Sequence, residues 1–181
     1  MDKGFGLAMA SGTTAHPLML IGVGPHARTF YLPLLARLQA AGRLRLAVTV
    51  DLESSREAVA GFLRGSIPPD EEIYVEPFSA HMPDAVRVRL DAAVARHAPV
   101  GVIISTDPLS HRAYAAWALE RGLNILLDKP ISSRAQAVTD PAAAEGIVTD
   151  ATMLAAAYER LQARRATCFS VCAHRRYHPG I

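Results

Sequence analysis

The chain has 181 residues, of which half are apolar, and it carries 19 lysines and arginines against 17 aspartates and glutamates. This length allows one domain or slightly more and excludes a large multidomain protein. A net charge of +2, with both signs mixed along the chain, provides no basic surface for nucleic acid or anionic lipid, and the apolar content excludes a disordered chain. We therefore expect a soluble globular protein with no nucleic-acid partner.

The ends of the chain and its cysteines indicate the compartment. Residues 1–16 are rich in Gly, Ser and Thr, and their apolar piece is too short for a signal peptide, so we predict a flexible tail. No apolar run approaches the roughly 20 residues of a membrane helix. Cys168 and Cys172 form neither a disulfide framework nor a metal-binding pattern with His. We expect buried, reduced thiols on one face of a strand, no bound metal and a cytoplasmic protein.

From residue 17 onward, short apolar runs alternate with longer segments of helical periodicity, a pattern typical of a parallel sheet with crossover helices. Strands are predicted over residues 18–21, 44–50, 73–75, 100–105, 125–127 and 167–173. Helices are predicted after the first strand, after residue 55, and over residues 84–97, 110–121 and 151–164. These elements predict a doubly wound, mostly parallel α/β sheet, a dinucleotide-binding Rossmann domain over residues 17–173.

Two segments interrupt this pattern. The first predicted helix has one apolar face, at Phe30, Leu34, Leu35 and Leu38, but Pro33 removes a helical donor, so we expect a kink or a shifted start. Residues 132–150 contain Pro and Gly and show no sustained period. They are predicted to form a loop or a short broken helix.

A glycine-rich segment lies between the first strand and the first helix. Residues 22–27 read G-V-G-P-H-A and match the G-x-G-x-x-G/A fingerprint in the position that its mechanism requires. The first glycine permits a tight turn, the second lets a pyrophosphate approach, and the free N–H groups of the helix start hold its phosphates. The cofactor-binding residues predicted here are Gly22, Gly24, Pro25, His26 and Ala27. The alternative is a turn that only reverses a tightly packed chain.

An acidic residue follows the second strand. Asp51 stands where a dinucleotide-binding fold places the carboxylate that accepts the ribose hydroxyls. A carboxylate would repel a 2′-phosphate, which favours NAD over NADP. Arg56 keeps NADP open as an alternative, because an arginine near the ribose can accept that phosphate.

The second half of the chain resembles a known family. Residues 102–130 contain a strand, then T-D-P-L-S-H, a helix ending A-L-E-R-G, and a strand ending D-K-P. This arrangement resembles the Gfo/Idh/MocA oxidoreductases, the glucose-fructose oxidoreductase and inositol dehydrogenase family. Residues 173–179 look like the segment that leads into the family's second domain. Asp128 stands where the family usually has Glu, and residues 132–150 are longer than its usual connection.

The resemblance implies cofactor contacts at the ends of two further strands, at Ser105, Thr106, Pro108, His111, Asp128 and Lys129. It implies that Lys129 lies nearest the reacting carbon and is the catalytic residue. An ammonium beside a carbinol oxygen lowers that oxygen's pKa and can relay a proton during hydride transfer. A solvated surface charge is the alternative for a lone lysine. The resemblance also suggests a cis bond before Pro130, and a supporting role rather than a direct catalytic one for His111.

The leading hypothesis is therefore an oxidoreductase that moves hydride between NAD(P) and a secondary alcohol or ketone of a sugar, cyclitol or related polyol. The family's α/β substrate domain would follow residues 174–181, which we interpret as the start of a connection, and with that domain we expect a homo-oligomer. The alternative is a dinucleotide-binding module, or a subunit, without turnover. A methyltransferase-like domain binding an adenosyl cofactor is a weaker third choice, because it gives no reason for the T-x-P-x-x-H and D-K-P elements.

Overall fold

Six parallel strands form the centre of the molecule. The structure, a computed structural model, describes residues 15–173, so most of the predicted tail and the predicted connection at 174–181 lie outside the described residues. The strand order is β3-β2-β1-β4-β5-β6 and every neighbouring pair is parallel, which confirms the doubly wound α/β fold. The strands are β1 (His16–Ile21), β2 (Leu44–Leu52), β3 (Glu71–Val75), β4 (Gly101–Ile104), β5 (Asn124–Leu127) and β6 (Phe169–Val171).

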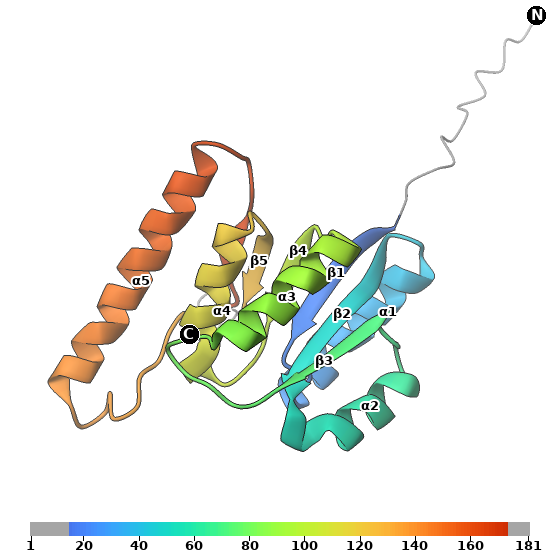
Figure 1. Ribbon diagram of the computed structural model, residues 1–181, viewed down its shortest axis with the longest axis horizontal. Helices are drawn as coiled ribbons and strands as arrows, with labels where there is room; N and C mark the ends of the chain where they lie inside the picture. The colour runs from blue at the N-terminus through green and yellow to red at the C-terminus, as the bar shows by residue number, and fades with distance from the viewer. Residues whose placement is uncertain (1–14, 174–181) are drawn as a thin grey trace, which may run out of the picture.

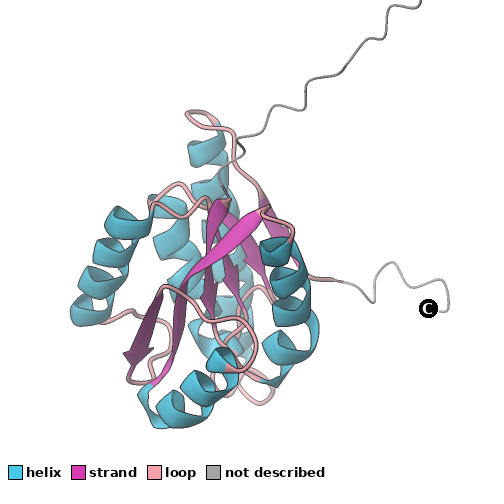
Figure 2. Cartoon of the chain, turned by 90° about the vertical axis from the view of Figure 1, so that its right-hand side faces the viewer, coloured by secondary structure: helices cyan, strands magenta, loops and turns pink. Residues whose placement is uncertain are grey.

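Helices cover both faces of this sheet (Figure 2). On one face, α1 (Leu32–Ala40) and α2 (Arg56–Arg64) pack against apolar side chains of the sheet such as Leu20 and Ile103. On the other face lie α3 (Asp84–His97), α4 (Pro108–Glu120) and α5 (Pro141–Gln162). Because β1 is covered on both sides, its last three residues are fully buried.

The first helical segment begins with a π-turn. Residues Ala27–Tyr31 form the π-helical segment η1, in which the Leu32 N–H donates to the Ala27 carbonyl oxygen, and α1 follows. Pro33 has no N–H to continue an α-helical ladder, so the regular helix starts late, as predicted. The predicted apolar face is wrong in part. The wider turn directs Tyr31, Leu32 and Leu35 toward the sheet and leaves Phe30 and Leu34 exposed.

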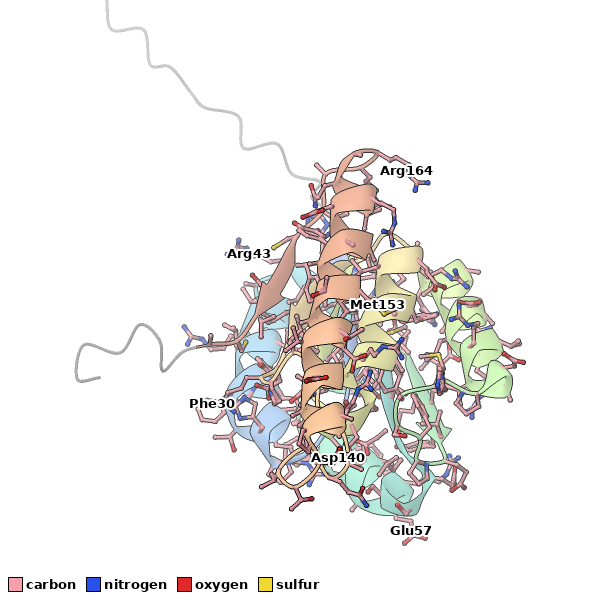
Figure 3. The ribbon with its side chains drawn as sticks, turned by 90° about the vertical axis from the view of Figure 1, so that its left-hand side faces the viewer. Phe30, Arg43, Glu57, Asp140, Met153 and Arg164 are labelled. Carbon is pink, nitrogen blue, oxygen red and sulfur yellow. The ribbon has the colours of Figure 1, made fainter. Side chains whose placement is uncertain are left out.

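The prediction of a loop or short broken helix over residues 132–150 is wrong in its second half, because α5 begins at Pro141, ten residues before the predicted start. Asp140 caps the helix by accepting a hydrogen bond from the Ala142 N–H at 2.9 Å, and Pro141 occupies a first-turn position where its missing N–H costs nothing. Gly146 is buried beneath the Arg134 guanidinium. α5 lies beside α4 at one end of the molecule (Figure 1) and runs along that side from Asp140, with Met153 outward (Figure 3).

The two cysteines are less buried than predicted. Cys168 is exposed and Cys172 is half-buried, and neither forms a disulfide. The cause is that β6, which lies between them, is an edge strand of the sheet. The Tyr31 hydroxyl donates to Cys172 Sγ at 3.2 Å, and burial together with this bond raises the pKa of Tyr31.

Candidate functional site: the carboxyl edge of the sheet

The candidate site lies where the strand order reverses. β1 pairs with β2 on one side and with β4 on the other, so the chain winds away from β1 in both directions. Ligands of open parallel sheets bind at such a switch point, beyond the carboxyl ends of the strands. A cavity of about 680 Å³ opens there. It is lined by Gly22, Gly24, Pro25, His26, Val50, Asp51, Leu52, Ser55, Val75, Pro77, Phe78, Ser105, Thr106, Asp107, Leu109, Ser110, Tyr114 and Asp128.

The glycine-rich turn forms the floor of this cavity, and its two glycines have different tasks. Gly22 has φ +91°, and a Cβ there would lie 2.6 Å from the carbonyl carbon of Ser105, so only glycine fits. A Cβ on Gly24 would meet nothing within 4 Å, although Gly24 lines the cavity. The space above Gly24 is therefore open to a ligand, as a pyrophosphate cradle requires.

Asp51 is tied to the glycine-rich turn. Its Oδ2 accepts a hydrogen bond from the Val23 N–H at 2.6 Å, and its Oδ1 accepts one from the Leu52 N–H at 2.7 Å. The Gly22 N–H donates to the Val50 carbonyl at 2.8 Å. Within residues 15–173, the Gly24 N–H has no protein acceptor, so it is available to donate to a phosphate.

Asp128 joins three loops at the other end of the cavity. Its Oδ2 lies 3.3 Å from His26 Nε2 and 3.4 Å from Ser105 Oγ, and its Oδ1 accepts the Lys129 N–H at 2.9 Å. The carboxylate is buried. It therefore connects the turn after β1, the loop after β4 and the start of the segment after β5.

Four of the predicted site residues do not line the cavity: Ala27, Pro108, His111 and Lys129. His111 is buried, with Nδ1 at 2.7 Å from the Pro130 carbonyl and Nε2 at 3.1 Å from the Thr106 carbonyl. It thus holds the loops after β4 and β5 together rather than facing the cavity. Lys129 is exposed beside Asp128, and its bond to Pro130 is cis, as the family resemblance suggests.

The structure adds lining residues that sequence reasoning missed. Val75, Pro77 and Phe78 come from the end of β3 and the segment after it. Their signal was available, because the carboxyl end of a third parallel strand must reach the same edge of the sheet. Tyr114 lies in the second turn of α4, where its spacing is that of an ordinary packing residue, so the sequence carried no signal for it.

Among residues 15–173, no group of three or more His, Cys, Asp or Glu side chains is placed to hold a metal ion. In the same part of the chain, no helix combines the length and the apolar character needed to cross a membrane.

The fold, the glycine-rich turn and Asp51 at the switch point define a dinucleotide-binding Rossmann domain. Residues 18–152 match the profile of the Gfo/Idh/MocA family, described as "Oxidoreductase family, NAD-binding Rossmann fold". The chain belongs to this family, and its cofactor is NAD. A comparison with curated proteins gives no match.

Solved structures share the fold. A Gfo/Idh/MocA family oxidoreductase from Vibrio cholerae is 20% identical with a TM-score of 0.58, over 91% of this chain and 40% of that one. The WlbA (WbpB) dehydrogenase from Thermus thermophilus, in complex with NAD and UDP-GlcNAcA, is 19% identical with a TM-score of 0.56, over 91% and 43%. D-galactose-1-dehydrogenase from Rhizobium etli is 17% identical with a TM-score of 0.55, over 93% and 40%. The chain spans 34–43% of the lengths of such structures.

Proposed function

We propose that this chain binds the dinucleotide of an oxidoreductase that moves hydride between NAD and a secondary alcohol or ketone carbon. The observation that carries the proposal is that Lys129 shares the carboxyl edge of the sheet with the glycine-rich turn. NAD, when bound, supplies the hydride acceptor. The chain's own residues bind and orient it: the Gly24 amide and the helix start hold the phosphates, Asp51 accepts ribose hydroxyls, and Ser105 and Thr106 lie toward the nicotinamide.

Lys129 has the chemistry for the proton transfer. Lys3 and Lys129 are the only lysines of the chain, and the other 17 cations counted in the sequence are arginines. In residues 15–173, every ion pair involves an arginine, His26 or His97. The Lys129 ammonium has no carboxylate partner in this part of the chain. Lysine, unlike arginine, serves as a proton donor and acceptor in catalytic sites. At this position the ammonium form would stabilise a developing alkoxide and donate a proton to it, and the neutral amine form would accept the hydroxyl proton in the opposite direction.

The Asp51 end of the cavity favours NAD over NADP. The Asp51 carboxylate would lie beside a 2′-phosphate and repel it. Arg56, which could accept that phosphate, is engaged by Glu53, with Nε and Nη2 at 2.5 and 2.7 Å from the two carboxylate oxygens. Its guanidinium also lies 4.3 Å above the ring of Tyr74.

A sugar, cyclitol or related polyol is the substrate class that we propose. The family resemblance supports it, and the printed names of two structural neighbours mention D-galactose and UDP-GlcNAcA. The free thiols of Cys168 and Cys172 support a reducing compartment such as the cytoplasm. The family resemblance also underlies the expectation of a homo-oligomer.

One observation favours a second candidate function, a dinucleotide-binding module or subunit without turnover of its own. Lys129 is exposed and does not line the cavity. The chain by itself would therefore enclose a bound cofactor more completely than a substrate beside Lys129. In this case NADH binds but no alcohol is oxidised.

Fluorescence titration of the purified chain with NADH and NADPH tests the proposal. We expect saturable binding of NADH with a Kd at least about tenfold below that for NADPH, given the Asp51 carboxylate beside the ribose. Binding of neither nucleotide would contradict the proposal. Assays of NAD reduction with a panel of sugars and cyclitols then separate the enzyme from the module.

A further inference from the structure

Tyr114 is a buried side chain with one polar atom at the cavity. It is 3% exposed, and it lines the cavity beside Phe78, with the two ring centroids 5.0 Å apart. Its ring belongs to the apolar core between α4 and the sheet. The aromatic part of the side chain is therefore accounted for by packing, which leaves its hydroxyl to be explained.

The Tyr114 hydroxyl differs from those of the other described tyrosines. Tyr31 donates to Cys172, Tyr74 to Glu72 and Tyr158 to the Thr167 carbonyl. The Tyr114 hydroxyl has no hydrogen-bond partner among residues 15–173. In this part of the chain, no fully buried side-chain oxygen or nitrogen lacks a hydrogen-bond partner. The Tyr114 hydroxyl, which has no partner, is therefore not fully buried, and we infer that it is accessible from the cavity that the ring lines. A buried tyrosine hydroxyl normally finds a partner, because leaving it without one costs free energy.

The hydroxyl belongs to the Asp51 end of the cavity. The negative charge of Asp51 acts on it and, after burial, is the second cause that raises the pKa of Tyr114. Phe78, its ring neighbour, follows β3, which lies on the far side of β2 from Asp128 and β5. A raised pKa keeps the phenol protonated at neutral pH, so that the oxygen presents a donor hydrogen to whatever fills this end.

We propose that Tyr114 binds the adenosine part of the dinucleotide, by donating its hydroxyl hydrogen to an acceptor atom of the adenine or of its ribose. This inference rests on the proposed function, in which Asp51 receives the hydroxyls of that same ribose. Tyr114 and Asp51 then supply a donor and an acceptor to one nucleoside, from α4 and from β2. The donor is held rigid by the packing of the ring, so little conformational entropy is lost when it binds.

The test is the variant Tyr114→Phe, which removes the hydroxyl and keeps the ring that packs on Phe78. Titration with NADH and, by competition, with ADP-ribose should show the Kd of both raised by the same factor, about 2- to 12-fold, the usual cost of one lost hydrogen bond to a neutral group. Tyr158→Phe is the matched control. It removes a tyrosine hydroxyl bonded to Thr167 in the segment before β6, and it should leave both Kd values unchanged. Circular dichroism and thermal unfolding check that both variants fold.

Each outcome has one meaning. If the unaltered chain binds NADH and folded Tyr114→Phe binds it equally well, the role of Tyr114 is wrong and the proposed function stands. If Tyr114→Phe weakens NADH but not ADP-ribose, the hydroxyl acts on the nicotinamide half, and its assignment to adenosine is wrong. If the unaltered chain binds neither ligand, the proposed function fails, and the inference fails with it.

Discussion

The two ends of the cavity are enclosed to different degrees. At the Asp51 end, side chains from the ends of β2 and β3 and from α4 surround the cavity, and Val75 and Tyr114 are buried there. At the Asp128 end, the carboxylate is buried, but Lys129 and Pro130 directly after it are exposed. Under the proposed function, the Asp51 end would thus form a nearly complete site for an adenosine, and the Asp128 end only the base of a site for the reacting carbon.

This difference separates binding from chemistry. Substitutions at the enclosed end should change the affinity for NADH, because its contacts are with the part of the cofactor that does not react. Substitutions at the open end should change turnover and leave affinity nearly unchanged, since the proposed function assigns Lys129 to the substrate and not to the cofactor. Substitutions at Gly22, Lys129, Gly24 and Glu53 test this separation, with expected effects that decrease in that order.

Gly22→Ala should disrupt both ends of the cavity together, because it destabilises the fold. A Cβ at φ +91° would overlap the Ser105 carbonyl group, which is backbone and cannot move aside. We expect the free energy of unfolding to fall by about 3 kcal/mol or more, measured by urea denaturation. Gly42→Ala is the control for the backbone strain alone, because Gly42 has φ +68° with nothing within 4 Å of a Cβ. Equal losses in the two variants would show that the contact with Ser105 is unimportant.

Lys129→Ala should affect the open end alone. In the assay that detects turnover, we expect kcat to fall about 100-fold or more, the usual contribution of a general acid or base. The Kd for NADH should stay within about twofold, because Lys129 does not line the cofactor cavity. Lys129→Arg keeps the positive charge but cannot release the proton, so it should be nearly as slow. A normal kcat in Lys129→Arg would limit the role of Lys129 to that of its charge.

Gly24→Ala should affect cofactor binding without affecting the fold. The added methyl group meets no protein atom within 4 Å and projects into the cavity, where the pyrophosphate must approach the backbone. We expect an unfolding free energy within about 0.5 kcal/mol of that of the unaltered chain, and a Kd for NADH raised at least about tenfold. An unchanged Kd for NADH would show that the pyrophosphate does not bind next to Gly24.

Much of the fold could be predicted because its signals are local. The boundaries of α3, residues 84–97, follow from helical periodicity, and the apolar run ending at Ile104 predicts β4. The failures have tertiary causes. Gly146 is compatible with α5 because the Arg134 side chain occupies the space that a Cβ would need, and no sequence period reports that contact. A proline inside residues 132–150 favours a loop in the sequence, whereas Pro141 directly after the Asp140 cap begins a helix.

Some residues of the candidate site could likewise be predicted from local signals, whereas others depend on tertiary packing. Gly22, Gly24 and Asp51 could be predicted because a turn and the strand end beside it carry a recognisable spacing. Tyr114 could not, because it meets Phe78 only when α4 packs beside the segment after β3. The place of His111 between two carbonyls likewise depends on how the loops after β4 and β5 fold together.

Glu53→Gln tests the smallest effect, the choice between NAD and NADP at the enclosed end. Glu53 accepts two hydrogen bonds from the Nε and Nη2 edge of the Arg56 guanidinium, and this interaction lowers the pKa of Glu53 and raises that of Arg56. Without that carboxylate charge, Arg56 can turn toward a 2′-phosphate, but Asp51 remains to repel it. We expect the Kd for NADPH to fall only about threefold, as for one exposed ion pair, while the Kd for NADH is unchanged.

The matched control for this change is Glu57→Gln. Glu57 is an exposed carboxylate of the next helical turn (Figure 3) and makes no ion pair among the described residues. The variant Glu57→Gln removes one negative charge, as Glu53→Gln does, but leaves the bond between Glu53 and Arg56 intact. The Kd for NADPH should therefore not change. If both variants improve NADPH binding to the same extent, general repulsion sets the preference and Arg56 has no part in it. If Glu53→Gln alone does so, the restraint on Arg56 is the cause, because only that variant frees a guanidinium for the phosphate.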